Sequence, residues 1–143
     1  MQNLLTMLVD DNDTDNFINR RILELNGFSG KIIIKKSATQ ALEYFQENCY
    51  NLSIIPDLLF LDINMPVVDG LQFLYKYDEL PENVKKKCYL VILSSSESLN
   101  DIKKFTEDEN VKKYYIKPLK PETLRALKFS LNWNEHPAAK GAN

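Results

Sequence analysis

Several short apolar runs of the sequence end in polar residues whose side chains carry a carboxylate, a hydroxyl or an ammonium group. These residues are Asp10, Asp11, Asp62, Ser94 and Lys117. Carboxylates held close together repel one another and need a cation, and Mg²⁺ prefers such hard oxygen ligands while keeping positions open for phosphate oxygens. A carboxylate beside bound Mg²⁺ is also a competent nucleophile toward phosphorus. These residue types therefore indicate metal-assisted phosphoryl transfer if the fold brings them together.

The apolar runs that must position these residues all have the length of a β-strand. Several are nearly continuous in hydrophobic residues, as expected of parallel strands buried on both faces. The five runs are Leu4–Val9, Lys31–Lys36, Leu58–Leu61, Tyr89–Leu93 and Tyr114–Ile116. Ligands of an open parallel sheet bind beyond the carboxyl ends of its strands. The residues that end the runs are therefore expected to converge on one edge of the sheet.

Segments with helical spacing alternate with these runs. The first ends at Asn26-Gly27, a typical helix C-cap, and the second begins at Ser37, with Gln40 spaced as in a capping box. The expected stripes are Phe17, Ile18, Arg21, Ile22 and Leu25; Ala38, Leu42 and Phe45; Leu71, Phe73, Leu74 and Tyr77; Ile102 and Phe105; and Leu124, Leu127, Phe129 and Leu131. The alternation predicts a doubly wound α/β fold with right-handed crossovers around a five-stranded parallel sheet.

Length and composition describe one globular domain. The 143 residues suffice for a single core, which we expect to span residues 1–133, with residues 134–143 as a flexible C-terminal tail. The net charge of −2 provides no positive field that would gather nucleic acid or an anionic membrane. Cys49 and Cys88 have neither metal-site nor disulfide spacing, which indicates free thiols and a cytoplasmic location.

The motifs around the polar residues resemble those of the receiver domain of two-component response regulators. They are Leu-Val-Asp10-Asp11-Asn, Leu-Phe-Leu-Asp62-Ile-Asn-Met65-Pro66, Asp69-Gly70, Ile-Leu-Ser94-Ser and Tyr114-Tyr-Ile-Lys117-Pro118. The resemblance extends from Leu4 to Leu131. It implies a flavodoxin-like sheet with strand order 2-1-3-4-5 and a cis peptide bond between Lys117 and Pro118.

The resemblance also implies a role for each polar residue. Asp62 would accept a phosphoryl group from a histidine kinase or a histidine phosphotransfer protein. Asp10 and Asp11 would hold Mg²⁺ together with Asp62, and the backbone carbonyl of Asn64 would complete the protein ligands. Lys117 would contact the phosphoryl group as a point charge. The chemistry is then mostly positioning and charge neutralisation, for which no general base is needed.

Ser94 and Tyr114 are expected to form the switch that reads the phosphoryl group. Ser94 would bond the phosphoryl group, and Tyr114 occupies the position of a switching aromatic residue in similar receivers. A tyrosine whose hydroxyl has two alternative partners can form a two-state element. We expect no covalently attached output domain, so the signal would pass to noncovalent partner proteins. These partners would bind on the face made by the fourth expected helix, the fifth strand and the fifth expected helix. No direct contact with nucleic acid or membrane is expected.

Two enzymatic or cofactor-binding alternatives conflict with the sequence. An FMN carrier of the same fold needs hydroxyls and amides after the first strand, where Asp10 to Asp13 would repel the FMN phosphate. An aspartyl-phosphate hydrolase needs a second aspartate as general acid, two residues after the nucleophilic aspartate. This chain has asparagine at that position, Asn12 after Asp10 and Asn64 after Asp62. We therefore expect the protein to be a phosphoacceptor switch that dephosphorylates itself slowly, and not an enzyme that turns over a substrate. A receiver-like interaction module that works without phosphorylation stays open.

Overall fold

The computed structural model describes residues 4–28, 30–64 and 70–135. Its centre is a sheet of five parallel strands in the order β2-β1-β3-β4-β5, as predicted. The strands are β1 (Leu5–Val9), β2 (Lys31–Lys35), β3 (Leu58–Leu61), β4 (Tyr89–Ser94) and β5 (Val111–Ile116). β5 begins three residues before the expected run, because Val111 already pairs with Leu90 of β4. Met65, Pro66 and Asp69 lie outside the described residues, as do residues 136–143 of the expected tail.

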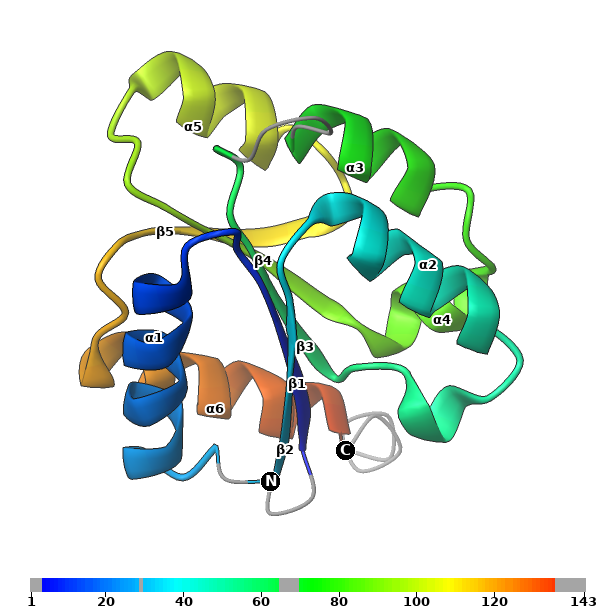
Figure 1. Ribbon diagram of the computed structural model, residues 1–143, viewed down its shortest axis with the longest axis horizontal. Helices are drawn as coiled ribbons and strands as arrows, with labels where there is room; N and C mark the ends of the chain where they lie inside the picture. Colours follow the sequence, from blue (N-terminus) through cyan, green and yellow to red (C-terminus); the bar gives the residue numbers. More distant parts are fainter. Residues whose placement is uncertain (1–3, 29, 65–69, 136–143) are drawn as a thin grey trace.

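Helices cover both faces of this sheet (Figure 1). They are α1 (Asp13–Leu25), α2 (Ala38–Asn48), α3 (Gly70–Tyr77), α4 (Glu82–Lys87), α5 (Leu99–Thr106) and α6 (Pro121–Glu135), with a 3₁₀ turn η1 (Leu52–Ile54). One hydrophobic layer joins α1 and α6 to the sheet through Leu23 and Leu127. The other joins α2, α3 and α5 through Phe45, Phe73 and Phe105. None of the described helices is both long enough and apolar enough to cross a membrane.

The structure adds α4 to the helices expected from the sequence. No helical stripe was expected at these residues, because Val84 is the single fully buried residue of α4 and gives no periodic signal. The fourth and fifth expected helices are therefore α5 and α6. Helix α6 continues to Glu135, two residues past the expected end of the domain.

The predicted helix caps are present in α1 and α2. Asn26 ends α1, and Gly27 follows with a φ of +86°, a conformation that glycine adopts without strain. The Phe28 amide then donates to the carbonyl of Leu23 at 2.9 Å, which closes a Schellman motif. At the start of α2, the Ser37 hydroxyl accepts the backbone N–H of Gln40 at 3.0 Å, whereas the Gln40 side chain accepts the N–H of Lys36 at 3.1 Å, so one of the two bonds of the expected capping box is formed.

The expected buried stripe of α1 is wrong. The structure buries Asn16, Asn19 and Leu23, whereas Phe17 is 67% exposed and Leu25 is 71% exposed. The inner face is polar near the strand ends, where the Asn16 amide donates to the carbonyl of Asp10 at 2.9 Å. Two buried amide side chains take the place of apolar contacts on this inner face, so hydrophobic periodicity alone selected the outer face. On α6, Phe129 of the expected stripe is likewise exposed.

Glycine 70 begins α3 at a crowded position. A Cβ atom added there would lie 2.8 Å from Cγ2 of Ile63 and 2.9 Å from Cε1 of Phe105. Both distances are shorter than real contacts of a Cβ atom allow. Helix α3, α5 and the residue that follows Asp62 are thus in close contact at Gly70.

Candidate functional site

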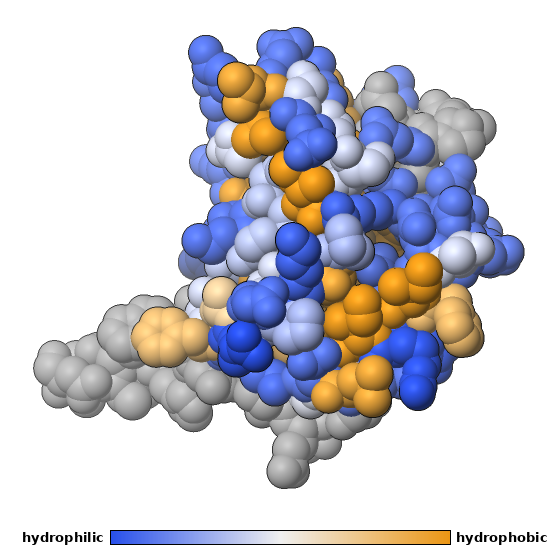
Figure 2. Space-filling model, turned by 90° about the vertical axis from the view of Figure 1, so that its left-hand side faces the viewer, coloured by the Kyte–Doolittle hydropathy of each residue, from blue (hydrophilic) through white to orange (hydrophobic). Residues whose placement is uncertain are grey.

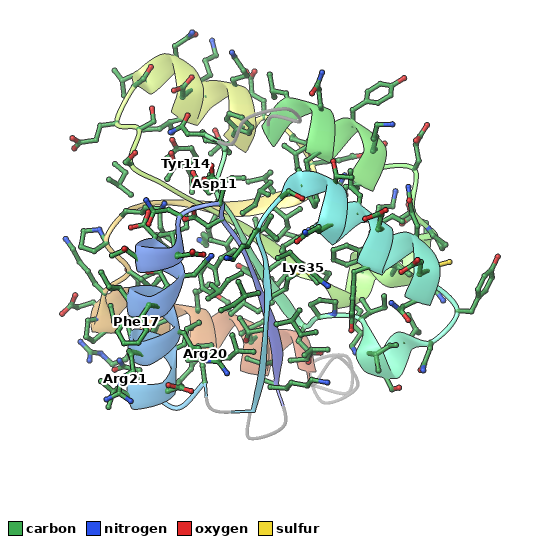
Figure 3. All side chains as sticks on the ribbon, viewed as in Figure 1. Asp11, Phe17, Arg20, Arg21, Lys35 and Tyr114 are labelled. Carbon is green, nitrogen blue, oxygen red and sulfur yellow. The ribbon has the colours of Figure 1, made fainter. Side chains whose placement is uncertain are left out.

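Parallel pairing brings the ends of the strands to one edge of the sheet. Val9 of β1 lies beside Leu61 of β3, so Asp10 and Asp62, the next residues, end neighbouring strands. The backbone N–H of Lys117 donates to the carbonyl of Ser94 at 2.8 Å, which ties the end of β5 to the end of β4. Figure 3 labels Asp11 at this edge. The predicted site residues therefore come from four strand ends that lie side by side.

Three carboxylates are clustered at this edge. One oxygen each of Asp10, Asp11 and Asp62 lies within 4.8 Å of the others. Asp10 and Asp62 are buried, whereas Asp11 is exposed. Oδ1 of Asp10 accepts the N–H of Asn12 at 2.9 Å, and Oδ1 of Asp62 accepts the N–H of Asn64 at 3.1 Å. These two bonds fix both buried carboxylates.

The ammonium of Lys117 contacts the other oxygens of the two buried carboxylates. Its Nζ lies 2.7 Å from Oδ2 of Asp10 and 3.6 Å from Oδ2 of Asp62. It also lies 2.8 Å from Oδ2 of Asp15, a residue that was not among the predicted site residues. Burial lowers the pKa of Lys117, but the hydrogen bonds to Asp10 and Asp15 and the negative charges of Asp62 and Asp10 together raise the pKa above its ordinary value. The lysine is therefore held as a cation.

The pKa of Asp62 is raised above its ordinary value. Burial is the largest cause, and the negative charge of Asp10 adds to it. The backbone hydrogen bond from Asn64 and the charge of Lys117 lower this pKa, but not enough to cancel the effect of burial. A dication among the three carboxylates would favour the ionised form of Asp62, as opposite charges do.

The donor set fits a hard divalent cation such as Mg²⁺. All three clustered side chains offer carboxylate oxygens, and the exposed Asp11 leaves one side open to solvent. Acidic side chains of this kind repel one another, and one ammonium does not neutralise them. The part played by the Asn64 carbonyl remains a prediction.

Ser94 and Tyr114 are linked at the end of β4. The buried Ser94 Oγ accepts the N–H of Ser96 at 3.0 Å and lies 3.4 Å from the amide nitrogen of the Asn64 side chain. The Tyr114 hydroxyl donates to the carbonyl of Ser96 at 3.0 Å. Ser96, which was not among the predicted residues, therefore lies between the two predicted switch residues.

The predicted cis peptide bond between Lys117 and Pro118 is present. Asp15 and Asn16 are the functional candidates that sequence reasoning missed. Both lie in the first turns of α1, where Asp15 binds Lys117 and Asn16 binds the backbone of Asp10. The sequence signal for both residues was the polar run that follows β1. Only the position at which α1 begins decides which residues of this run face the strand ends.

Comparisons with known proteins agree with this fold. The family model "Response regulator receiver domain" matches residues 6–128. A solved two-component response regulator from Cytophaga hutchinsonii has a TM-score of 0.83 and 27% sequence identity, covering 92% of this chain and 98% of that one.

Two curated relatives match across most of the chain. The probable methanogenesis regulatory protein FilR2 of Methanothrix harundinacea is 27% identical over 139 residues, 93% of this chain and 87% of that protein. Hybrid signal transduction histidine kinase I of Dictyostelium discoideum is 29% identical over 118 residues, which are 82% of this chain but 7% of that kinase. The chain belongs to the response regulator receiver domain family of two-component signalling.

Proposed function

We propose that this receiver domain accepts a phosphoryl group on Asp62 from a histidine kinase or a histidine phosphotransfer protein, in a Mg²⁺-dependent reaction. The observation that carries the proposal is the convergence of Asp10, Asp11 and Asp62 within 4.8 Å, with the Lys117 ammonium against two of them. Structural carboxylates need neither such crowding nor such burial. Crowded acids beside one cation are a typical arrangement for charge neutralisation during phosphoryl transfer.

The transfer step needs no proton acceptor on the nucleophile. One oxygen of the ionised Asp62 carboxylate attacks phosphorus and forms the acyl phosphate. The P–N bond of the donor phosphohistidine breaks, and its electron pair leaves on the imidazole nitrogen. Asn64 keeps Oδ1 of Asp62 oriented through its N–H, and Lys117 supplies positive charge on the side of Oδ2.

Asp10, Asp11 and Asp62, together with the backbone carbonyl of Asn64, are the groups that would hold Mg²⁺. When bound, Mg²⁺ neutralises the carboxylates and the oxygens of the phosphoryl group. The Ser94 hydroxyl would bond a phosphoryl oxygen once the acyl phosphate has formed. Slow hydrolysis of the acyl phosphate, in which water takes the phosphoryl group as inorganic phosphate and the Asp62 carboxylate is restored, would reset the switch.

The donor must approach Asp62 across the exposed residues that surround the site. Phe17 and Ile18 lie on the outer face of α1, whose first turn contacts Lys117 through Asp15. Figure 2 faces the side of the molecule where α1 lies and shows hydrophobic surface beside strongly hydrophilic residues. This outer face of α1 is the surface that the donor protein would cover.

The output partner would bind on the face made by α5, β5 and α6. Leu99 at the start of α5 and Ile116 at the end of β5 are exposed apolar residues on these elements. Tyr114 of β5 binds the carbonyl of Ser96 in the present state. Attraction of Ser94 toward a phosphoryl group would pull on Ser96 and change the partner available to the Tyr114 hydroxyl. Coupling between two such sites typically amounts to about 1–3 kcal/mol.

Incubation with acetyl phosphate and Mg²⁺, followed by intact-protein and peptide mass spectrometry, tests the proposal. We expect one added phosphoryl group on Asp62, which EDTA prevents. Asp62→Asn keeps the shape of the side chain but lacks the nucleophile, so the adduct should disappear. Asp57→Asn is the matched control, because Asp57 lies at the opposite end of β3 and binds the backbone of Leu5. Full labelling of Asp62→Asn would contradict the assignment, and no labelling of the wild type would favour the phosphorylation-independent module.

A further inference from the structure

The ammonium of Lys117 has one carboxylate partner outside the acidic cluster. Its Nζ lies 2.8 Å from Oδ2 of Asp15, but 3.6 Å from Oδ2 of Asp62. The carboxylate of the phosphoacceptor is thus the most distant of its three anionic partners, because Asp10 lies at 2.7 Å. Lys117 is thus held closest to Asp10 at the end of β1 and to Asp15 of α1, and less closely to the carboxylate that the proposed function makes the acceptor.

The position of Asp15 is fixed by the first turn of α1. Its backbone N–H donates to Oδ1 of the N-cap residue Asn12 at 2.9 Å. The next residue, Asn16, donates its side-chain amide to the carbonyl of Asp10 at 2.9 Å. The turn is therefore anchored to the end of β1 on both sides of Asp15.

The pair formed by Asp15 and Lys117 is more sheltered than an ordinary surface ion pair. The Lys117 side chain is 15% exposed and the Asp15 side chain is 36% exposed. Water screens such a pair less than it screens two fully exposed charges. When Asp10 serves as a metal ligand, Asp15 remains as a partner of the ammonium that competes with the phosphoryl group.

We propose that Asp15 is a positioning residue that holds the Lys117 ammonium away from Asp62 and thereby slows phosphorylation. The inference rests on the proposed function, in which Asp62 is the acceptor. Loss of the Asp15 carboxylate frees Lys117 to meet the incoming phosphoryl group. The charge and reach of residue 15 would thus set the rate at which the switch is loaded.

Asp13 offers a matched control in the same turn of α1. It pairs with Lys36 at 2.7 Å, and among the described residues the ion pairs of Lys117 are with Asp10, Asp15 and Asp62, not with Asp13. Asp13→Asn and Asp15→Asn each remove one negative charge from the first turn. Only the second removes a partner of Lys117.

The rate of Asp62 labelling by acetyl phosphate at saturating Mg²⁺ is the first measurement. We expect Asp15→Asn to label about threefold to fivefold faster than the wild type, which is the range of a partly exposed ion pair. Asp15→Ser should behave alike, and Asp13→Asn should remain close to the wild type. In a Lys117→Ala background the effect of Asp15→Asn should vanish, whereas a general effect of charge on the donor would persist. Equal rates for Asp13→Asn and Asp15→Asn, or an effect that survives in Lys117→Ala, would overturn the inference.

NMR of the lysine ammonium groups in the metal-free protein tests the contact without any phosphorylation. A protected ¹H–¹⁵N signal of Lys117 is expected in the wild type and in Asp13→Asn, with faster solvent exchange in Asp15→Asn. An unchanged exchange rate in Asp15→Asn would overturn the restraint. Absence of labelling in every variant would overturn the proposed function itself. Labelling at one common rate would overturn only the role of Asp15.

Discussion

Two regions of the molecule surround a lysine with acidic side chains, and they differ in burial. At the carboxyl ends of the strands, Lys117 meets the buried Asp10 and Asp62. Between α3, α4 and the start of β5, Lys85 meets the exposed Asp78 and Glu82 at 3.3 and 3.2 Å. The Asp78 carboxylate also accepts a hydrogen bond from the Asn110 amide at 2.9 Å. Similar ion pairs thus lie in two different dielectric surroundings.

The pKa values of the carboxyl groups Asp62 and Asp78 shift in opposite directions. Burial raises the pKa of Asp62, whereas hydrogen bonds from Asn110 and then Lys85 lower the pKa of Asp78. Charges around Asp78 are matched by partners and connect neighbouring elements. Charges around Asp62 are crowded beyond what Lys117 can match, which is typical of a site organised for chemistry. The difference in desolvation therefore distinguishes the structural ion pair of Asp78 and Lys85 from the reactive pair of Asp62 and Lys117.

Removal of each lysine is expected to give the largest difference between the regions. Lys117→Ala removes the cation that faces the acceptor, and we expect Asp62 labelling by acetyl phosphate to slow by about 10²-fold to 10³-fold, as for loss of one charge-stabilising donor. Lys85→Ala should label at the rate of the wild type. Labelling kinetics by mass spectrometry test this, with thermal melts to verify that both variants are folded. A similar loss in both variants would mean that the effect of Lys117 is structural.

Asp62→Asn is expected to stabilise the metal-free protein. The folded-state pKa of Asp62 is raised, so its ionisation opposes folding, and this cost appears as the pH rises from the unfolded-state pKa through the folded-state pKa. We expect the variant to have a free energy of unfolding about 1 kcal/mol higher at pH 7 in EDTA, with little difference near pH 4. Urea denaturation at the two pH values measures this. A variant less stable than the wild type at pH 7 would contradict the desolvation argument.

Asp78→Asn should show the opposite dependence on pH and the smallest effect. The folded-state pKa of Asp78 is lowered, so its ionised form contributes stability above the unfolded-state pKa, and this contribution disappears as the pH falls through the folded-state value. The variant should therefore be slightly less stable at pH 7 and equal to the wild type in acid. The same urea series provides the comparison, and a stabilised Asp78→Asn protein would erase the contrast with Asp62.

The five parallel strands and the edge that gathers the site were predictable, because apolar runs of strand length end in polar residues and parallel strands share their carboxyl ends. The order of the strands followed only from the resemblance to receiver domains. The buried face of α1 was not predictable, since its inner residues Asn16 and Asn19 are polar. Asp15 was equally hidden among Asp11, Asn12 and Asp13. Helix α4 has one buried anchor, Val84, which is too little for a periodic signal.

The contact at Gly70 limits how this sequence can change. The space that a methyl group at position 70 would need is already filled by Ile63 and Phe105, which come from two other segments. A larger residue at position 70 would force these side chains apart at a cost of roughly 1–3 kcal/mol. Positions 63, 70 and 105 must therefore vary together, so that relatives with alanine at the position of Gly70 are expected to carry a smaller side chain at one of the other two.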